Sequence, residues 1–218
     1  MNASRDVRSL AEAINRARPR LTETDQRISV ALYRLLGEGE PVTPADLAVA
    51  TDLPEPEIET RLEKWPGTLR DEQGGVVGLW GLSVAEMPPH EIFLDERRLW
   101  AWCAWDTLFL PRRLGATLDV RSRSPVTGQV ITLVVAPEGV RAVEPAEVVV
   151  SFLEPNRPFD GDVIKSFCCY VHFFADAESG EKWTSQHPGT FLISLEDAFE
   201  LGRLTDEALF PALARADR

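Results

Sequence analysis

The segment "RRLWAWCAWDTLFLP", residues 97 to 111, is too apolar for a surface segment, yet it carries a thiol and a carboxylate. We predict that it forms a buried helix, which Pro111 ends. Residues three apart share one face of a helix, so Cys103 and Asp106 are expected to point the same way. Because burying a carboxylate without a partner is costly, Asp106 indicates a site and not ordinary packing. We expect it to accept the proton or the hydrogen bond of the thiol.

Two adjacent thiols lie in "KSFCCYVHFF", residues 165 to 174, whose aromatic and β-branched content predicts a strand. Side chains alternate between the two faces of a strand. Cys168 then has polar neighbours on its face, whereas Cys169 has apolar neighbours on the other. We therefore expect Cys168 to meet Cys103 and Asp106, and Cys169 to lie in the core.

The rest of the C-terminal part alternates between strands and helices. Residues 115 to 143 are predicted to form strands with turns at "SPVTG" and "APEG", and "EVVVSFLEP" is predicted to form another strand. The last segment, "LEDAFELGRLTDEALFPALARA", residues 195 to 216, has the pattern of a helix. We predict that residues 91 to 218 form an α+β domain with a central mixed or antiparallel sheet.

The N-terminal part is predicted to be mainly helical. Residues 5 to 18 and 24 to 36 have apolar residues at helical spacing, and Thr43 with Pro44 begins a short helix that a second helix, 54 to 65, follows. An alternating segment around "GG" then predicts a β-hairpin. Residues 1 to 82 are therefore predicted to form a winged helix-turn-helix-like domain, and residues 83 to 90 a connector to the second domain.

The charge distribution disfavours nucleic acid as a partner. The formal net charge of the chain is −12, which repels polyanions and anionic membranes at long range. The helix 54 to 65, which would enter the major groove, carries four glutamates against Arg61 and Lys64. Across residues 1 to 82 there are 10 Lys and Arg against 14 Asp and Glu. We expect this domain to cover the second domain and not to read DNA.

The cysteines and the hydropathy predict a cytoplasmic protein. The chain has three cysteines, of which two are adjacent, and this is a poor framework for disulfides and suits a reducing compartment. No apolar run approaches the roughly 20 residues that span a bilayer, and the start of the chain has no apolar signal-peptide core.

Two common chemistries of cysteine and histidine lack support. Zinc bound by Cys103, Cys168 and His172 would be expected to show CxxC or HxxxH spacing, which is absent. A Cys–His–Asp hydrolase would use His172 or His187, but neither accompanies a recognisable nucleophile motif.

Four segments carry a resemblance to a known family. "LWAWCAWDTLFLP", "TGQVITL", "AVEPAE" and "SFCCYVHFFA" resemble the signature blocks of the bacterial organomercurial lyases, also called alkylmercury lyases, over about residues 97 to 202. The resemblance implies that Cys103 and Cys168 bind mercury and that Asp106 shuttles protons beside it. It also implies that Cys169 is not catalytic and that a winged-helix-like domain precedes the catalytic domain.

The resemblance further implies a reaction. Alkyl- and arylmercury compounds would be cleaved by protonolysis to a hydrocarbon and Hg(II), with no cofactor required. The Hg(II) product would stay bound until low-molecular-weight thiols such as glutathione, or a mercuric reductase, removed it.

Two alternatives remain open from the sequence. One is a mercury- or organometal-responsive DNA-binding sensor, and the other is a protein that sequesters soft metals on the same fold. Asp106 favours the enzyme over the sensor, because a sensor needs donors for the metal but no proton for carbon. The sequence alone does not separate the sequestering protein from an enzyme.

Overall fold

The N-terminal part of the computed structural model, which describes residues 6 to 211, begins with four helices. Thr43 and Pro44 start α3 as expected from the sequence: Thr43 forms a capping box and Pro44 occupies the first turn. Thr22 forms a second capping box at the start of α2, which the sequence analysis did not predict. The helices are α1 (Val7–Ala17), α2 (Glu23–Leu36), α3 (Pro44–Thr51) and α4 (Glu55–Lys64). All four helices predicted in this part are present.

The strands form two antiparallel sheets. The larger has the order β1-β2-β3-β5-β4-β6-β7-β8 and the smaller the order β10-β9-β11. In both sheets, neighbouring strands run antiparallel. The first contains β1 (Thr68–Arg70), β2 (Val76–Leu79), β3 (Leu82–Ser83), β4 (His90–Leu94), β5 (Arg97–Ala101), β6 (Leu118–Arg123), β7 (Val130–Ala136) and β8 (Gly139–Glu144). The second contains β9 (Val149–Leu153), β10 (Phe173–Phe174) and β11 (Thr190–Ser194).

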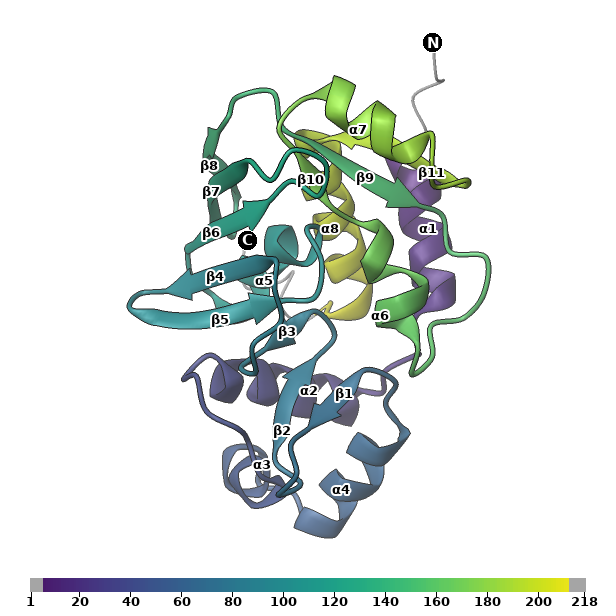
Figure 1. Ribbon diagram of the computed structural model, residues 1–218. Coiled ribbons are helices and arrows are strands. Elements are labelled where there is room, and N and C mark those ends of the chain that lie inside the picture. Colours follow the sequence, from purple (N-terminus) through teal and green to yellow (C-terminus); the bar gives the residue numbers. More distant parts are fainter. Residues whose placement is uncertain (1–5, 212–218) are drawn as a thin grey trace.

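The hairpin β1–β2 of the N-terminal part extends the large sheet, so the two parts of the chain share one sheet (Figure 1). The remaining helices are α5 (Asp106–Leu114), α6 (Val163–Ser166), α7 (Ala177–Thr184) and α8 (Leu195–Leu209). In space, α1 packs on α8, away from α3 and α4 (Figure 1). The fold is α+β, and the predicted strands of residues 115 to 143 and of "EVVVSFLEP" are confirmed. The predicted last helix is confirmed as far as Leu209; its end at residue 216 lies outside the described residues.

The prediction of one helix over residues 97 to 111 is wrong. Residues Arg97–Ala101 form β5, and α5 starts only at Asp106. Asp95, with a φ of 54°, makes the tight turn that pairs β5 with β4. The prediction failed because a continuous apolar run that is buried in a sheet has no hydrophobic period by which it could be distinguished from a buried helix. Pro111 lies inside α5, which ends instead at Gly115 in the left-handed conformation.

The prediction of a strand over residues 165 to 174 is also wrong. The segment forms the end of α6, a 3-10 turn η1 (Cys168–Tyr170) and only two residues of strand, β10. Local hydrogen bonds replace a strand ladder: the N–H of Val171 donates to the carbonyl of Cys168 at 3.0 Å. Consequently Cys169 is exposed and not in the core as predicted.

A buried ion pair fastens α5 to α8. The guanidinium of Arg113 donates to the carboxylate of Asp206 at 2.8 Å, and both side chains are almost fully buried. The same guanidinium donates to the hydroxyl of Tyr33 on α2 and to the carbonyl of Trp80 at 3.2 Å, and lies 4.1 Å from the ring centre of Phe109. One cation therefore joins two helices of the C-terminal part to α2 and to the turn after β2.

None of the helices in residues 6 to 211 has the length and apolar character that crossing a bilayer requires.

Replacing Asp206 by alanine is expected to destabilise the protein by about 3 to 5 kcal/mol, because Arg113 then stays buried without its acid. The measurement is the free energy of unfolding from urea denaturation. Glu207→Gln is the matched control, since Glu207 pairs with Arg203 on the half-exposed side of α8 and should cost less than about 1 kcal/mol. Equal losses in the two variants would mean that the buried pair contributes no more than a surface pair.

Candidate active site

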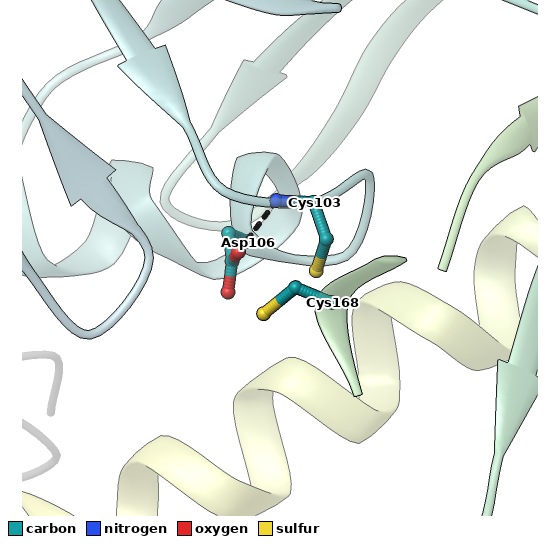
Figure 2. A group of neighbouring side chains, drawn as sticks. All are labelled: Cys103, Asp106 and Cys168. Carbon is teal, nitrogen blue, oxygen red and sulfur yellow. Dashed lines mark hydrogen bonds between the residues drawn. The ribbon is translucent and has the colours of Figure 1, made fainter. Parts of the chain in front are cut away.

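Two thiols and one carboxylate meet between α5 and η1. Cys103 lies in the turn after β5, Asp106 is the first residue of α5, and Cys168 begins η1 (Figure 2). A sulfur of each cysteine and a carboxylate oxygen of Asp106 all lie within 4.8 Å of one another. All three residues are buried, with Cys103 at 0% exposed. The structure thus brings together the three site residues named from the sequence, and it leaves Cys169 outside.

Backbone hydrogen bonds hold these segments in register. The N–H of Cys103 donates to the carboxylate of Asp106 at 2.8 Å. This bond holds the carboxylate next to the residue whose thiol it contacts. The N–H of Ala104 donates to the carbonyl of Val171 at 3.1 Å, which ties the turn of Cys103 to the turn of Cys168. Cys103 and Asp106 are neighbours although they do not share a helix face, because a carboxylate at a helix start reaches back to the preceding N–H groups.

Gly81 makes room for the carboxylate. Its φ is +103°, a conformation that residues with a side chain rarely adopt. A Cβ atom at this position would lie 2.6 Å from Oδ1 of Asp106, closer than any real contact. The second glycine of "GLWGLS" is thus required by the site, which the sequence analysis did not recognise.

The cluster borders a cavity with a mainly aromatic wall. Asp106 and Cys168 line the cavity, whereas Cys103 lies behind them. The aromatic wall consists of Trp80, Trp102, Trp105, Phe109, Phe159 and Phe167, and the other charged residues of the wall are Arg18, Arg113 and Asp160. Arg18, Pro19, Pro66, Trp80 and Gly81 come from the first 82 residues, so both parts of the chain build the wall.

Burial acts to raise the pKa of each group of the cluster. It raises the pKa of Asp106 to about 6, although hydrogen bonding with Cys103 and the charge of Arg113 oppose this shift. Burial also raises the pKa of Cys103, and the contact with Cys168 and the charge of Asp106 add to the effect. Hydrogen bonding with Cys103 lowers the pKa of Cys168, but burial and the charge of Asp106 outweigh it, so that pKa is raised as well. A carboxyl group that titrates near neutrality therefore lies beside two protonated thiols.

This arrangement suits a soft metal and a proton transfer. Thiolate sulfur is the ligand that soft metals prefer, and a carboxylate in contact with both thiols can accept a proton and return it. Within residues 6 to 211, no histidine joins the cluster. A ring nitrogen of His172 contacts the carbonyl of Cys169 at 2.8 Å, and His187 stacks on Trp183 with ring centres 3.7 Å apart. The geometry therefore supports neither the zinc site nor the Cys–His–Asp hydrolase considered from the sequence.

The fold resembles that of a solved structure. The crystal structure of the mercury-bound form of MerB2 superimposes with a TM-score of 0.71, covering 93% of this chain and 98% of that chain. The two sequences are 24% identical, so this comparison concerns the fold alone.

Sequence comparisons are more specific. A family model described as alkylmercury lyase matches residues 82–205, and a model described as the helix-turn-helix domain of alkylmercury lyase matches residues 8–80. The alkylmercury lyase of Pseudomonas putida is 47% identical over 175 residues, which are 80% of this chain and 81% of that protein. The alkylmercury lyase of Bacillus cereus is 42% identical over 79% of this chain and 78% of that protein, and the one of Streptomyces lividans is 39% identical over 82% and 81%. With both parts of its sequence matched in this way, the chain belongs to the alkylmercury lyase family of enzymes.

Proposed function

We propose that this enzyme cleaves the carbon–mercury bond of alkyl- and arylmercury compounds by protonolysis, with Cys103, Asp106 and Cys168 as its catalytic residues. The observation that carries the proposal is the buried cluster of two thiols and a carboxyl group at an apolar cavity. An apolar wall accepts the organic group of the substrate, and the cluster offers the two sulfur donors and the acid that the reaction needs.

Capture of mercury requires thiolates. A thiol of the cluster gives its proton to the thiolate ligand that mercury carries in solution; that ligand leaves as a free thiol, and the cysteine sulfur takes its place on mercury. The second sulfur then adds to mercury, and its proton passes to the carboxylate of Asp106, which lies in contact with both thiols. Asp106 also lies close enough to contact the mercury held by Cys103 and Cys168.

Cleavage then uses the stored proton. Two thiolates push electron density through mercury onto the bonded carbon, and the carboxyl group of Asp106 delivers its proton to that carbon. The electron pair of the carbon–mercury bond becomes the new carbon–hydrogen bond, and mercury stays Hg(II) between the two sulfurs. A pKa of about 6 lets Asp106 accept a proton and release it near neutral pH.

Product release is an exchange of thiols. Hg(II) held by two sulfurs is displaced when solution thiols such as glutathione, or a mercuric reductase, supply competing thiolates. The protein chemistry is complete without a resident cofactor. The cytoplasm, which is rich in thiols, suits both this exchange and the three free cysteines.

We also infer a winged helix-turn-helix-like domain in residues 1 to 82, a connector in 83 to 90 and the catalytic domain in 91 to 218. The first domain acts as a cover, and its contribution to the cavity wall supports this role. We expect no binding of nucleic acid, because the chain is acidic and Arg61 of α4 is already paired with Asp25 at 2.7 Å and with Glu57 at 2.8 Å. The acidic chain has no membrane partner either.

Cys168→Ser is expected to abolish the release of benzene from phenylmercury, because a hydroxyl does not replace a thiolate toward mercury. Cys169→Ser is the matched control: this thiol is exposed, so benzene release and stability should both be nearly unchanged. Benzene is measured by gas chromatography under excess thiol. Equal loss of turnover in the two folded variants would contradict the assignment of Cys168.

Asp106→Asn separates cleavage from mercury binding. The variant keeps the size and polarity of the side chain but has no titratable proton, so benzene release should fall by a factor on the order of 10² to 10⁴. Binding of Hg²⁺ through the two thiols should persist, as measured by titration in parallel. Asp119→Asn, at an exposed carboxylate of β6, is the control. If Asp106→Asn released benzene as fast as the unmodified enzyme, the proton would come from another group.

The pH profile should show the titration of Asp106. In the free enzyme Asp106 must be a carboxylate to take the proton of a thiol, so kcat/KM for phenylmercury should rise as pH increases through about 6. The raised pKa places this limb above the usual range of an aspartate. The measurement is kcat/KM between about pH 5 and pH 7.5 for the enzyme and for Asp106→Asn, which should lack the limb. A flat profile for the unmodified enzyme would refute the role of Asp106 as proton acceptor.

A further inference from the structure

Arg18 is a cation in the wall of the active-site cavity that the proposed reaction does not use. It follows α1 directly and lines the same cavity as Asp106 and Cys168. Its guanidinium carbon lies 5.4 Å from the ring centre of Trp105 and 5.8 Å from that of Phe109. Its Nη1 atom is buried and has no hydrogen-bond acceptor among the described residues.

A buried guanidinium with a free N–H is costly, because it has lost water without gaining an acceptor. Contact with aromatic faces repays part of that cost. The second cation of the wall, Arg113, shows the usual solution, since it is paired with Asp206 at 2.8 Å. Burial lowers the pKa of Arg18 to about 10, so its side chain is still charged at neutral pH.

Neither the helix nor the nearby acids account for this cation. A cation is favoured at the C-terminus of a helix, but the Nη1 of Arg18 reaches no backbone carbonyl. The carboxylate of Asp106 accepts the N–H of Cys103. Asp160, the other acid of the wall, is exposed and lies 3.9 Å from Arg157. The free N–H is therefore available to a ligand in the cavity.

We propose that Arg18 is a specificity residue that binds an anionic substituent, above all a carboxylate, on the organic group of the organomercury substrate. The inference rests on the proposed function, because the cluster of Cys103, Asp106 and Cys168 would hold the mercury end of the same molecule. A planar guanidinium matches a carboxylate with parallel hydrogen bonds. The aromatic wall between the two ends suits an aryl ring. The favoured substrate class is thus arylmercury carboxylates.

The test compares phenylmercury with meta- and para-mercuribenzoate, with mercaptoethanol as an uncharged thiol so that no other carboxylate competes. The measured quantity is the ratio of kcat/KM for the carboxylate substrate to kcat/KM for phenylmercury. In Arg18→Gln this ratio should fall about 10- to 100-fold for at least one isomer, the range of a hydrogen bond between charged groups. Arg18→Lys should retain part of the ratio. Arg20→Gln, at an exposed arginine two residues away, should retain all of it.

A second arm needs no turnover: benzoate is titrated into the metal-free enzyme and followed by NMR. Its binding should weaken at least about 10-fold in Arg18→Gln and stay the same in Arg20→Gln. An unchanged ratio for both isomers in Arg18→Gln, whether the two kcat/KM values stay the same or fall equally, would overturn the inference, and so would unchanged benzoate binding. If the unmodified enzyme released no benzene from phenylmercury, the proposed function would fail, while the benzoate titration would still decide the role of Arg18.

Discussion

The site depends on one hydrogen bond, from the N–H of Cys103 to the carboxylate of Asp106. A carboxyl group in an apolar cavity is stable only if something satisfies it, and here the acceptor is satisfied by the backbone of the residue whose thiol it contacts. This bond fixes the start of α5 and the direction of the carboxylate together. The absence of a side chain at Gly81 leaves the space that the carboxylate occupies. Geometry and acidity have opposing causes: the hydrogen bond that holds the carboxylate lowers its pKa, and burial outweighs this and raises the pKa to about 6.

The site also requires that the turn of Cys103 and the turn of Cys168, which are far apart in the sequence, lie side by side. Cys103 follows a strand of the large sheet, and Cys168 lies in a turn before the small sheet. The hydrogen bond between Ala104 and Val171 joins the two turns, and the N–H of Trp102 donates to the carbonyl of Gly81 at 3.0 Å. Because backbone groups make these links, they fix the backbone positions of Cys103 and Cys168 relative to each other.

Local patterns predicted most of the fold. Caps such as Thr43 act within a few positions, and so do the apolar periods of α1 and α2. The two wrong segments, 97–111 and 165–174, are apolar runs whose form depends on partners outside the run. In the first, β5 pairs with β4, and in the second, the carbonyl of Val171 accepts the N–H of Ala104. The spacing of Cys103 and Asp106 still predicted a contact, because three positions bring residues together at a helix start as well as on its face. The roles of Gly81 and Arg18 could not be predicted from local patterns, because they depend on contacts in the folded chain: Gly81 lies against the carboxylate of Asp106, and Arg18 lines the cavity.

The cavity also explains why the chain buries so many charges. Asp106 needs an apolar setting to have a pKa near neutrality. Its ionised form is then stabilised by a positive charge, which must be distant enough not to return the pKa to its usual value. Arg113 provides such a charge. Because Arg113 is paired with Asp206, it stabilises the ionised form of Asp106 only in part, and the pKa of Asp106 stays raised. The same residue joins α5 to α8, to α2 and to the turn that precedes Gly81. Arg113 therefore links the packing of the helices to the pKa of Asp106. A substitution of Arg113 would change the charge near Asp106 and the packing of the helices together.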